Sequence, residues 1–502
     1  MFLFHLPKTL QFQLFLERFI PMKGNSPDSN QPSFLLPSLK EQLDPNHPIY
    51  QLNERINWSV IEEDFKKLYS HTGRPAKPVR LMVSLLLLKQ LEDLSDEQVI
   101  RRWVDIPYWQ YLSGETHFQW KPPAASSDLT HFRKRIGKKG AERLLKLSID
   151  LFNPKIQKEE VVIDTTVQEK NITYPTDSKL AKKVIDTCRN IANQEGIPLR
   201  QSYSRVTPQL LRQASNRKSP VQKIKARKAT RRLQTIGRAL VRELVRKMPQ
   251  KQISPYAQTL LDAWSILLQN KTDKHKIYSL HEPHVSCISK GKAHKPFEFG
   301  SKVSISRTRD SGIILGALAL PGNPYDGHTV QDALKQIKRI IGKQPEILIA
   351  DRGYKGQKEF GKTRLLTPSV PLKTDSQYDQ RKQRIRFRKR AGLEATISHL
   401  KQHFRMGKCY LKGELGDQIN VILAAAAYNL RQWIRLSLDP FFVLFLNRVA
   451  PKQNVESTLF LSNRRELARL TIVHYVSPKS KPRRTSAGRF SPKSGRGICQ
   501  RS

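Results

Sequence analysis

Residues 345–354 read PEILIADRGY, a short apolar run that ends at Asp351 and is followed by a glycine turn. A second run, EVVIDTTV at residues 160–167, is rich in β-branched residues and carries Asp164 near its end. Short runs of this kind, bounded by turn residues and charges, predict buried strands. The two runs therefore predict two strands of one sheet, each with an aspartate at or near its end.

Further segments complete an α/β pattern around these two strands. The other expected elements are strands at 296–305 and 312–320, a helix at 329–341, a short helix and a short strand (RLLTP) after Asp351, a long basic helix at 383–406 and an apolar helix at 419–436. Without the insertion described next, this order is that of a ribonuclease-H-like core, a mixed sheet flanked by helices. In that fold the strands of Asp164 and Asp351 are adjacent, and Glu394 reaches them from the basic helix.

Two regions outside this order have helical patterns. In residues 46–150, the apolar run VRLMVSLLLLKQL predicts one helix, and Ser95-x-x-Gln98 is a candidate capping box for the next. Two helices joined by a short turn resemble a helix-turn-helix, although an ordinary helical hairpin is commoner. Residues 178–275 are very basic, with apolar side chains recurring every three to five positions, which predicts an all-helical insertion.

The two ends of the chain differ from the regions between them. Residues 1–45 end in a stretch rich in Ser, Pro and Asn, and we expect a poorly ordered extension. Residues 436–502 are basic and end in a stretch rich in Ser, Pro, Gly and Arg, which predicts a largely disordered extension. The expected α/β core then comprises residues 160–177 and 276–435.

The charge of the chain points to a polyanionic partner. Lys and Arg number 89 against 43 Asp and Glu, a formal net charge of +46 that is spread along the whole chain. A compact protein this basic repels itself unless a polyanion neutralises it, and the usual polyanion is nucleic acid. The segment SSDLTHFRKRIGKKGAERLL, which contains Arg133 and Arg135, could lie along DNA phosphates or form a solvated helix face.

The cysteines and the hydropathy indicate a cytoplasmic protein. The four cysteines lie far apart and form no CxxC pair, which is typical of a reduced cytosolic chain. No apolar run approaches the roughly 18 residues of a membrane span. The apolar N-terminus lacks a basic first region and a cleavage site, so we expect neither a signal peptide nor a membrane partner.

Asp164, Asp351 and Glu394 are candidate metal ligands. Mg²⁺ is a hard cation that prefers oxygen ligands. Two such ions about 3.5–4 Å apart can hold both the attacking and the leaving oxygen of a phosphodiester exchange. The simpler alternative is that these residues are ordinary, because an aspartate after a strand is often a turn former and glutamates are common on helices.

Two other groups of residues deserve an interpretation. Asp326 and His328 precede the helix at 329–341, and we expect them to cap it, with a place in the site as the alternative.

Zinc-ligand residue types also recur in one short segment, at His281, His284, Cys287 and His294. Their spacing matches no established zinc pattern, and strand alternation would splay the side chains, so we do not expect a zinc site.

Five motifs in a fixed order carry a family resemblance. They are TGRPAKPVRLMVSLLLLKQL, IDTTVQEKNITYPTDSKL, SLHEPHVSCISKGKAHKPFEFGSKVS, GNPYDGHT with ILIADRGYKG, and FRKRAGLEATISHLK. From about Asn46 to Trp433 the chain resembles the DDE transposases of bacterial insertion sequences, in the family named after insertion sequence five. The last motif resembles the signature Tyr-x2-Arg-x3-Glu-x6-Lys, with Phe387 where tyrosine is usual.

The resemblance implies roles for individual residues. Asp164, Asp351 and Glu394 would be the metal ligands, with Mg²⁺ as the cofactor and Mn²⁺ as a substitute. Arg390 and Lys401 fit the signature one and two helical turns from Glu394. Arg390 could contact DNA phosphate or orient Glu394, and Lys401 would meet the DNA backbone. An ion pair between Arg390 and Glu394 is the alternative.

Arg352 and Tyr354, beside Asp351, could also reach DNA or serve the structure. Arg133 and Arg135 are the DNA-contact candidates of the helical region.

The resemblance also implies an activity. A transposase of this kind cleaves DNA at the terminal inverted repeats of an insertion sequence and joins the freed 3′-hydroxyl to target DNA, by two-metal-ion hydrolysis and transesterification. Both element ends must be held together, so a homodimer is expected on double-stranded DNA, in the nucleoid of a bacterial cytoplasm. Residues 46–150 would recognise the repeats, and the insertion would clamp flanking DNA. The alternative is a catalytically inactive, transposase-derived DNA-binding protein.

Overall fold

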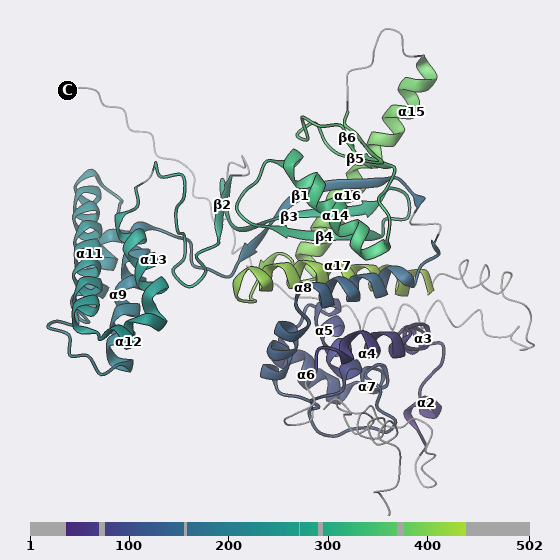
Figure 1. The fold of residues 1–502 in the computed structure, drawn as a ribbon, viewed down its shortest axis with the longest axis horizontal. Helices are drawn as coiled ribbons and strands as arrows, with labels where there is room; N and C mark the ends of the chain where they lie inside the picture. Colours follow the sequence, from purple (N-terminus) through teal and green to yellow (C-terminus); the bar gives the residue numbers. More distant parts are fainter. Residues whose placement is uncertain are drawn as a thin grey trace, which may run out of the picture. The chain divides into compact units, whose positions relative to one another are not determined.

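A computed structural model describes residues 37–69, 76–154, 158–270, 272–289, 295–368 and 376–437. Most of the two expected extensions, residues 1–36 and 438–502, lies outside these ranges. Figure 1 shows one sheet with helices against it, a group of N-terminal helices and a further helical group. Of the helices that the structure describes, none combines the length and apolar character that a membrane span requires.

One mixed sheet forms the centre of the fold. Its strands are β1 (Val161–Lys170), β2 (Ser286–Ser289), β3 (Phe297–Thr308), β4 (Ile314–Leu320), β5 (Ile347–Ile349), β6 (Glu359–Phe360), β7 (Thr363–Leu366) and β8 (Lys408–Cys409). The central order is β4-β3-β1-β5-β7, in which β1 runs antiparallel to β3 and parallel to β5. The sheet confirms the expected ribonuclease-H-like arrangement. Strand β8 pairs with the distal end of β1.

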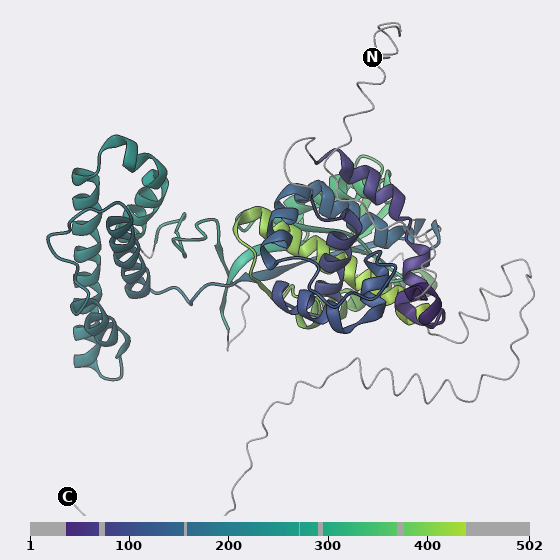
Figure 2. The same ribbon diagram turned by 90° about the horizontal axis from the view of Figure 1, so that it is seen from below.

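Helices cover the sheet because their apolar faces need burial. They are α14 (Thr329–Ile341), α16 (Ala391–His403) and α17 (Gly413–Ser437), whereas η3 (Asp326–His328) and the polar helix α15 (Gln377–Arg388) contain no buried residue. Helix α17 is almost entirely buried from Ile419 to Leu430, as expected of a helix that is apolar all round. It packs on β4 and on the N-terminal helices, as Figure 2 shows.

Two elements differ from the sequence-based expectation. The basic segment expected to be one helix at 383–406 is divided into α15 and α16 at Lys389 and Arg390. No helix forms between Asp351 and β7. Instead β6 and β7 make a small hairpin, because the glycines on either side of β6, Gly356 and Gly361, adopt positive φ of 108° and 62°, which a helix does not tolerate.

The N-terminal domain is helical, as expected. Its helices are α2 (Leu39–Gln42), α3 (Pro48–Arg55), α4 (Trp58–Lys66), α5 (Val79–Leu91), α6 (Asp96–Asp105), α7 (Pro107–Leu112) and α8 (Ser126–Asp150). The capping box of α6 is present, since Ser95 Oγ accepts from the Gln98 N–H at 3.1 Å. Helix α2 falls within the segment expected to be a poorly ordered extension, but Leu39 is buried and its N–H donates to Thr116, so the domain begins before residue 46.

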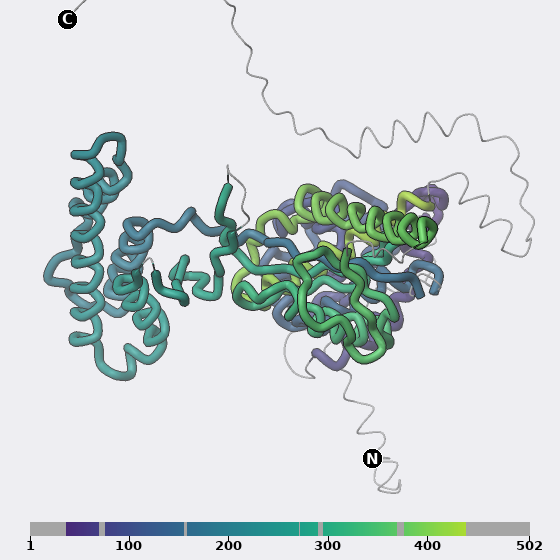
Figure 3. Tube along the Cα trace, turned by 90° about the horizontal axis from the view of Figure 1, so that it is seen from above, coloured from purple at the N-terminus to yellow at the C-terminus, as the bar shows by residue number. Residues whose placement is uncertain are grey.

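The insertion between β1 and β2 has a hydrophobic core of its own. Its helices are α9 (Asp177–Gln194), α10 (Val206–Ser215), α11 (Pro220–Lys247), α12 (Gln250–Ile253), η2 (Ser254–Tyr256) and α13 (Ala257–Leu268). Figure 3 shows them packed side by side in teal. Ile185 of α9, Leu240 of α11 and Leu267 of α13 meet in a cluster separate from that of the sheet.

A buried ionic cluster joins the two ends of the insertion to the sheet. Lys170, the last residue of β1, lies 2.6 Å from Asp417 of α17 and 3.2 Å from Glu282, which precedes β2. His284 Nε2 and Ser301 Oγ contact the other oxygen of Asp417 at 3.1 and 2.6 Å. The side chains of the three principal charges are at most 5 % exposed, so each depends on its partners for solvation.

We predict that Lys170→Met destabilises the protein much more than a surface substitution. Removing the lysine leaves two buried carboxylates without a cation, and breaking a buried ion pair costs about 3–5 kcal/mol. Urea unfolding followed by intrinsic fluorescence would measure the loss. Lys335→Met is the matched control, because Lys335 pairs with Asp332 on the surface at 3.4 Å, and an exposed pair contributes at most about 1 kcal/mol. Equal losses for the two variants would contradict the prediction.

Candidate active site

The pairing register of β1 and β5 sets the positions of the two aspartates. Val162 of β1 lies opposite Ile349 of β5 in a parallel ladder. Asp164 and Asp351 each follow these partners by two residues, so they lie level with one another at the end of the ladder. Neighbouring strands are about 4.8 Å apart. Their side chains therefore start from adjacent strands at the same edge.

Glu394 comes to this edge from the first turn of α16. Arg390, the residue that precedes α16, extends between the carboxylates: its Nη1 is 3.5 Å from Asp164 Oδ2 and its Nη2 is 3.3 Å from Glu394 Oε1. The ion pair that sequence reasoning kept as an alternative for Arg390 is thus present, and it includes Asp164 as well. Glu394 is the more solvent-exposed carboxylate, with 63 % of its side chain accessible against 19 % for Asp164.

The other two carboxylates interact electrostatically with Asp164. Burial raises the pKa of Asp164 to about 6, and the negative charges of Asp351 and Glu394 act in the same direction. The Thr165 N–H, which donates to Asp164 Oδ1 at 2.8 Å, and the Arg390 guanidinium oppose that rise in pKa. Clustered acids raise one another's pKa in this way unless a cation neutralises them.

The donor chemistry of the site fits a divalent cation, but the carboxylates are not gathered around a common point. All three candidates offer hard oxygen ligands, as Mg²⁺ and Mn²⁺ require. Within the described residues, however, no three His, Cys, Asp or Glu side chains lie close enough to hold a metal ion. Arg390 spans the gap between two of them. A resident ion would therefore require Arg390 to release these carboxylates.

A turn before α14 holds the strand that carries Asp164, and sequence reasoning gave it the wrong role. Asp326 Oδ1 accepts a hydrogen bond from Thr165 Oγ1 at 2.6 Å. The same oxygen forms an ion pair with Lys302 at 2.6 Å. Neither Asp326 nor His328 makes a side-chain cap on α14, so the capping expectation is wrong. Asp326 instead contacts Thr165, the residue that follows Asp164 in β1.

The same turn also braces the loop of Asp351. The Tyr325 hydroxyl donates to the Gly353 carbonyl and accepts from the Lys355 N–H at 2.8 Å. Gly327 lies so near this loop that a Cβ would come within 2.7 Å of the Lys355 oxygen. The motif GNPYDGHT was visible in the sequence, but no sequence pattern told which loop Tyr325 would contact. One turn thus supports both aspartates.

Of the DNA-contact candidates near Asp351, the structure exposes one and buries another. Arg352 is exposed and Lys401 is half-buried. Tyr354 is only 3 % exposed and packs in the hydrophobic core, which favours the structural role over the DNA contact that the sequence also allowed. The Gly353 turn, fixed by its N–H to Asp351 Oδ1 at 2.9 Å, separates exposed Arg352 from buried Tyr354.

The two arginines of α8 also differ. Arg133 is 6 % exposed, and its guanidinium forms two hydrogen bonds to Asp96, at 2.9 and 2.6 Å. Lys89 contacts the same carboxylate at 2.7 Å. Arg133 therefore joins α8 to α6 and is not available to DNA, which corrects the expectation. Arg135 is exposed, with its guanidinium 4.6 Å from the centre of the Tyr69 ring.

Two of the zinc-type residues have partners of another kind in the described part of the chain. His281 lies beside Ser279, and His284 belongs to the buried cluster with Asp417. His294 is outside the described residues.

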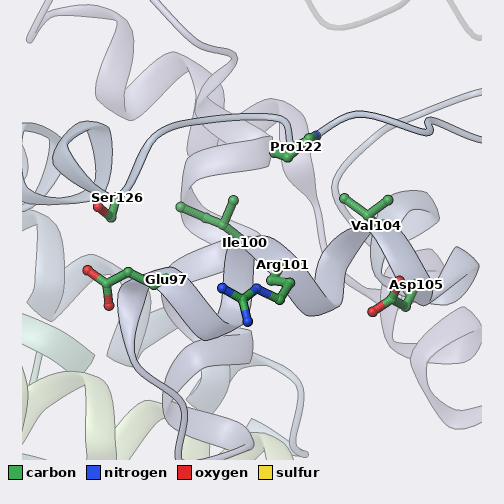
Figure 4. Close-up of a pocket in the computed structure, with 7 residues that line it drawn as sticks. All are labelled: Glu97, Ile100, Arg101, Val104, Asp105, Pro122 and Ser126. Carbon is green, nitrogen blue, oxygen red and sulfur yellow. The ribbon is translucent and has the colours of Figure 1, made fainter.

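A shallow surface pocket of about 430 Å³ lies on the N-terminal domain. Figure 4 shows Ile100 and Val104 of α6 below Pro122, with Glu97 at the left, Asp105 at the right and Arg101 between them. None of the three carboxylates lines it, so it is separate from the candidate active site.

Comparisons with known proteins agree with the geometry. Residues 37–135 match a family described as a transposase domain, and residues 254–430 match the transposase DDE domain. The chain is also 40 % identical over 191 residues to the uncharacterized protein ORF8 in the nfe locus of Rhizobium meliloti, a match that spans 37 % of this chain and 92 % of the relative. No solved structure matches the chain. The first match covers the N-terminal helices and the second covers β2 to most of α17, so the chain belongs to the DDE transposases, metal-dependent enzymes that bind and cleave DNA.

Proposed function

We propose that this transposase cleaves DNA at the terminal inverted repeats of an insertion sequence and joins the freed ends to target DNA, with Asp164, Asp351 and Glu394 as the metal ligands. The observation that supports this assignment most is the β1–β5 register, which places two aspartates level on adjacent strands. Glu394 adds the third carboxylate from α16, linked to Asp164 through Arg390. The subfamily named after insertion sequence five is compatible with the signature around Glu394.

The chemistry that two bound divalent ions supply is stabilisation of the attacking and leaving oxygens in an in-line displacement. The chain's own contribution is to hold carboxylates at one edge and to place a cation, Arg390, among them. An arginine fork binds phosphate as well as it binds carboxylate. Arg390 would therefore leave Asp164 and Glu394 for the DNA backbone when substrate binds, and the two carboxylates would become free for Mg²⁺ or Mn²⁺.

We predict that Asp351→Asn abolishes cleavage while leaving DNA binding intact. The amide keeps the side-chain size but loses the negative charge, so cleavage of a labelled duplex carrying the element's terminal repeat should fall at least about 100-fold. Wild-type cutting should require Mg²⁺ or Mn²⁺ and stop with EDTA.

Asp332→Asn is the control, because Asp332 is an exposed residue of α14. If Asp351→Asn cut as fast as wild type, the ligand assignment would be wrong. Binding without cutting by wild type in either metal would favour the inactive, transposase-derived DNA-binding protein.

The insertion presents a basic face suited to duplex DNA. Helix α11 carries a single acidic residue, Glu243, which is buried and paired with Lys247 at 2.7 Å. The other basic side chains of the helix form no ion pair within the described residues. Those that are exposed face away from the buried apolar side chains of the helix. The exposed basic residues are Lys223, Lys225, Arg227, Lys228, Arg231, Arg232, Arg242 and Arg246. We propose that this face clamps flanking DNA through its phosphates.

We predict that replacing Arg227, Arg231 and Arg242 together by glutamine flattens the salt dependence of DNA binding. Each phosphate contact contributes about 0.9 to the slope of log affinity against log salt, so the slope should fall by about 2 to 3. Fluorescence anisotropy between about 50 and 200 mM salt would measure it.

A matched control replaces three exposed lysines of the core, Lys335, Lys338 and Lys343, by glutamine. If both triple variants kept the wild-type slope of log affinity against log salt, the proposed contact between the insertion and DNA would be contradicted.

The remaining assignments follow from the same proposal. The N-terminal domain would recognise the inverted repeats, using the exposed side chains Lys134, Arg135 and Lys139 on α8 and Trp120, which is 81 % exposed, before it. Holding two element ends together would require a homodimer on DNA. Arg352 and Lys401 would add backbone contacts near the cut, and the protein would act at the bacterial nucleoid.

A further inference from the structure

Tyr354 has an unusual environment for a tyrosine. It is 3 % exposed, and its N–H donates to the Asp351 carbonyl at 3.3 Å, which fixes the residue three positions after the candidate ligand. Among the described residues, no group meets hydrogen-bonding geometry with its hydroxyl, although Thr165 is near. Buried hydroxyl groups are almost always paired, so an unpaired one at a functional site calls for a physical explanation.

The surroundings of this hydroxyl are acidic. The carboxylates of Asp164, Asp326 and Asp351 all lie near enough to interact electrostatically with the Tyr354 hydroxyl. It is thus a hydrogen-bond donor surrounded by acceptors that it does not bond. Those acceptors have other partners: Asp326 binds Lys302 and Thr165, and Asp351 Oδ1 accepts from Gly353.

Asp164 is the acceptor whose present partner is replaceable. Its Oδ1 accepts from the Thr165 backbone, whereas its Oδ2 lies at the long distance of 3.5 Å from the Arg390 guanidinium. Arg390 also holds Glu394, and so keeps the carboxylates apart. Once Arg390 turns to DNA phosphate, the Asp164 carboxylate would need a new donor to fix its orientation.

We propose that Tyr354 is a positioning residue whose hydroxyl donates to Asp164 in the working site, after Arg390 has released that carboxylate. The proposal rests on the assignment of Asp164 as a metal ligand. Carboxylates that ligate metals are commonly oriented by hydrogen bonds from neighbouring residues, and loss of such a bond typically lowers metal affinity or activity by about 10- to 100-fold. The hydroxyl is buried and has no hydrogen-bond partner among the described residues, so it is available to donate to Asp164.

Tyr354→Phe in the full-length protein tests this role. Because the hydroxyl has no hydrogen-bond partner among the described residues, its removal should leave the melting temperature unchanged or raise it. Mn²⁺ affinity in the presence of saturating DNA, measured by electron paramagnetic resonance, should fall at least about 10-fold, and cleavage at the same DNA concentration should fall about 10- to 100-fold. The dissociation constant for DNA should not change.

Tyr111→Phe is the matched control. Tyr111 is also buried, but its hydroxyl donates to Glu54 at 2.7 Å, so this variant should melt earlier and bind Mn²⁺ like wild type. Wild-type Mn²⁺ affinity in Tyr354→Phe would overturn the proposal, as would a lowered melting temperature like that of Tyr111→Phe. Failure of the wild type to cut DNA would instead count against the proposed function, and the Mn²⁺ titration would still decide the role of Tyr354.

Discussion

The parallel ladder between β1 and β5 is the contact on which the candidate site depends. It is short, with Val161 and Val162 opposite Leu348 and Ile349, and all four side chains are buried or nearly so. Register in a buried strand is strongly specified, because a slip of one residue would turn every side chain to the other face. Asp164 and Asp351 follow Val162 and Ile349 by two positions, so the same register aligns the two aspartates. The precision of the site therefore comes from apolar packing two residues before each carboxylate.

Much of this arrangement could be predicted from sequence, and the errors have one cause. Strand runs, the helix at Thr329–Ile341 and the all-helical insertion were readable because periodicity and turn residues are local signals. Arg133 and Tyr354 looked available to DNA, but a sequence does not show that Asp96 or the hydrophobic core will enclose them. Asp326 looked like a cap because the partners of its side chain, Thr165 and Lys302, are distant in the chain.

Polar contacts around the site form two layers with different purposes. Asp326, Tyr325 and Gly327 contact backbone and neighbouring residues, and they fix the loops without touching the candidate ligands' outer oxygens. Arg390 instead contacts the ligands themselves, at distances of 3.3 and 3.5 Å that are long for charged partners. The loops that carry the aspartates are thus fixed, whereas Arg390 is held only weakly. This combination suits a site in which DNA phosphates draw the Arg390 guanidinium away from the carboxylates.

The separate core of the insertion also bears on how the chain folds. β1 must pair with β3 and β5, which follow it only after the whole helical insertion. Closing a long flexible loop slows the formation of such distant pairs. Because helices α9, α11 and α13 bury their own apolar side chains, they can collapse locally and shorten the effective loop. Such a collapse would bring Lys170 and Glu282, which are 3.2 Å apart in the folded protein, close together early, so a folded segment between two strands need not slow the assembly of the strands around it.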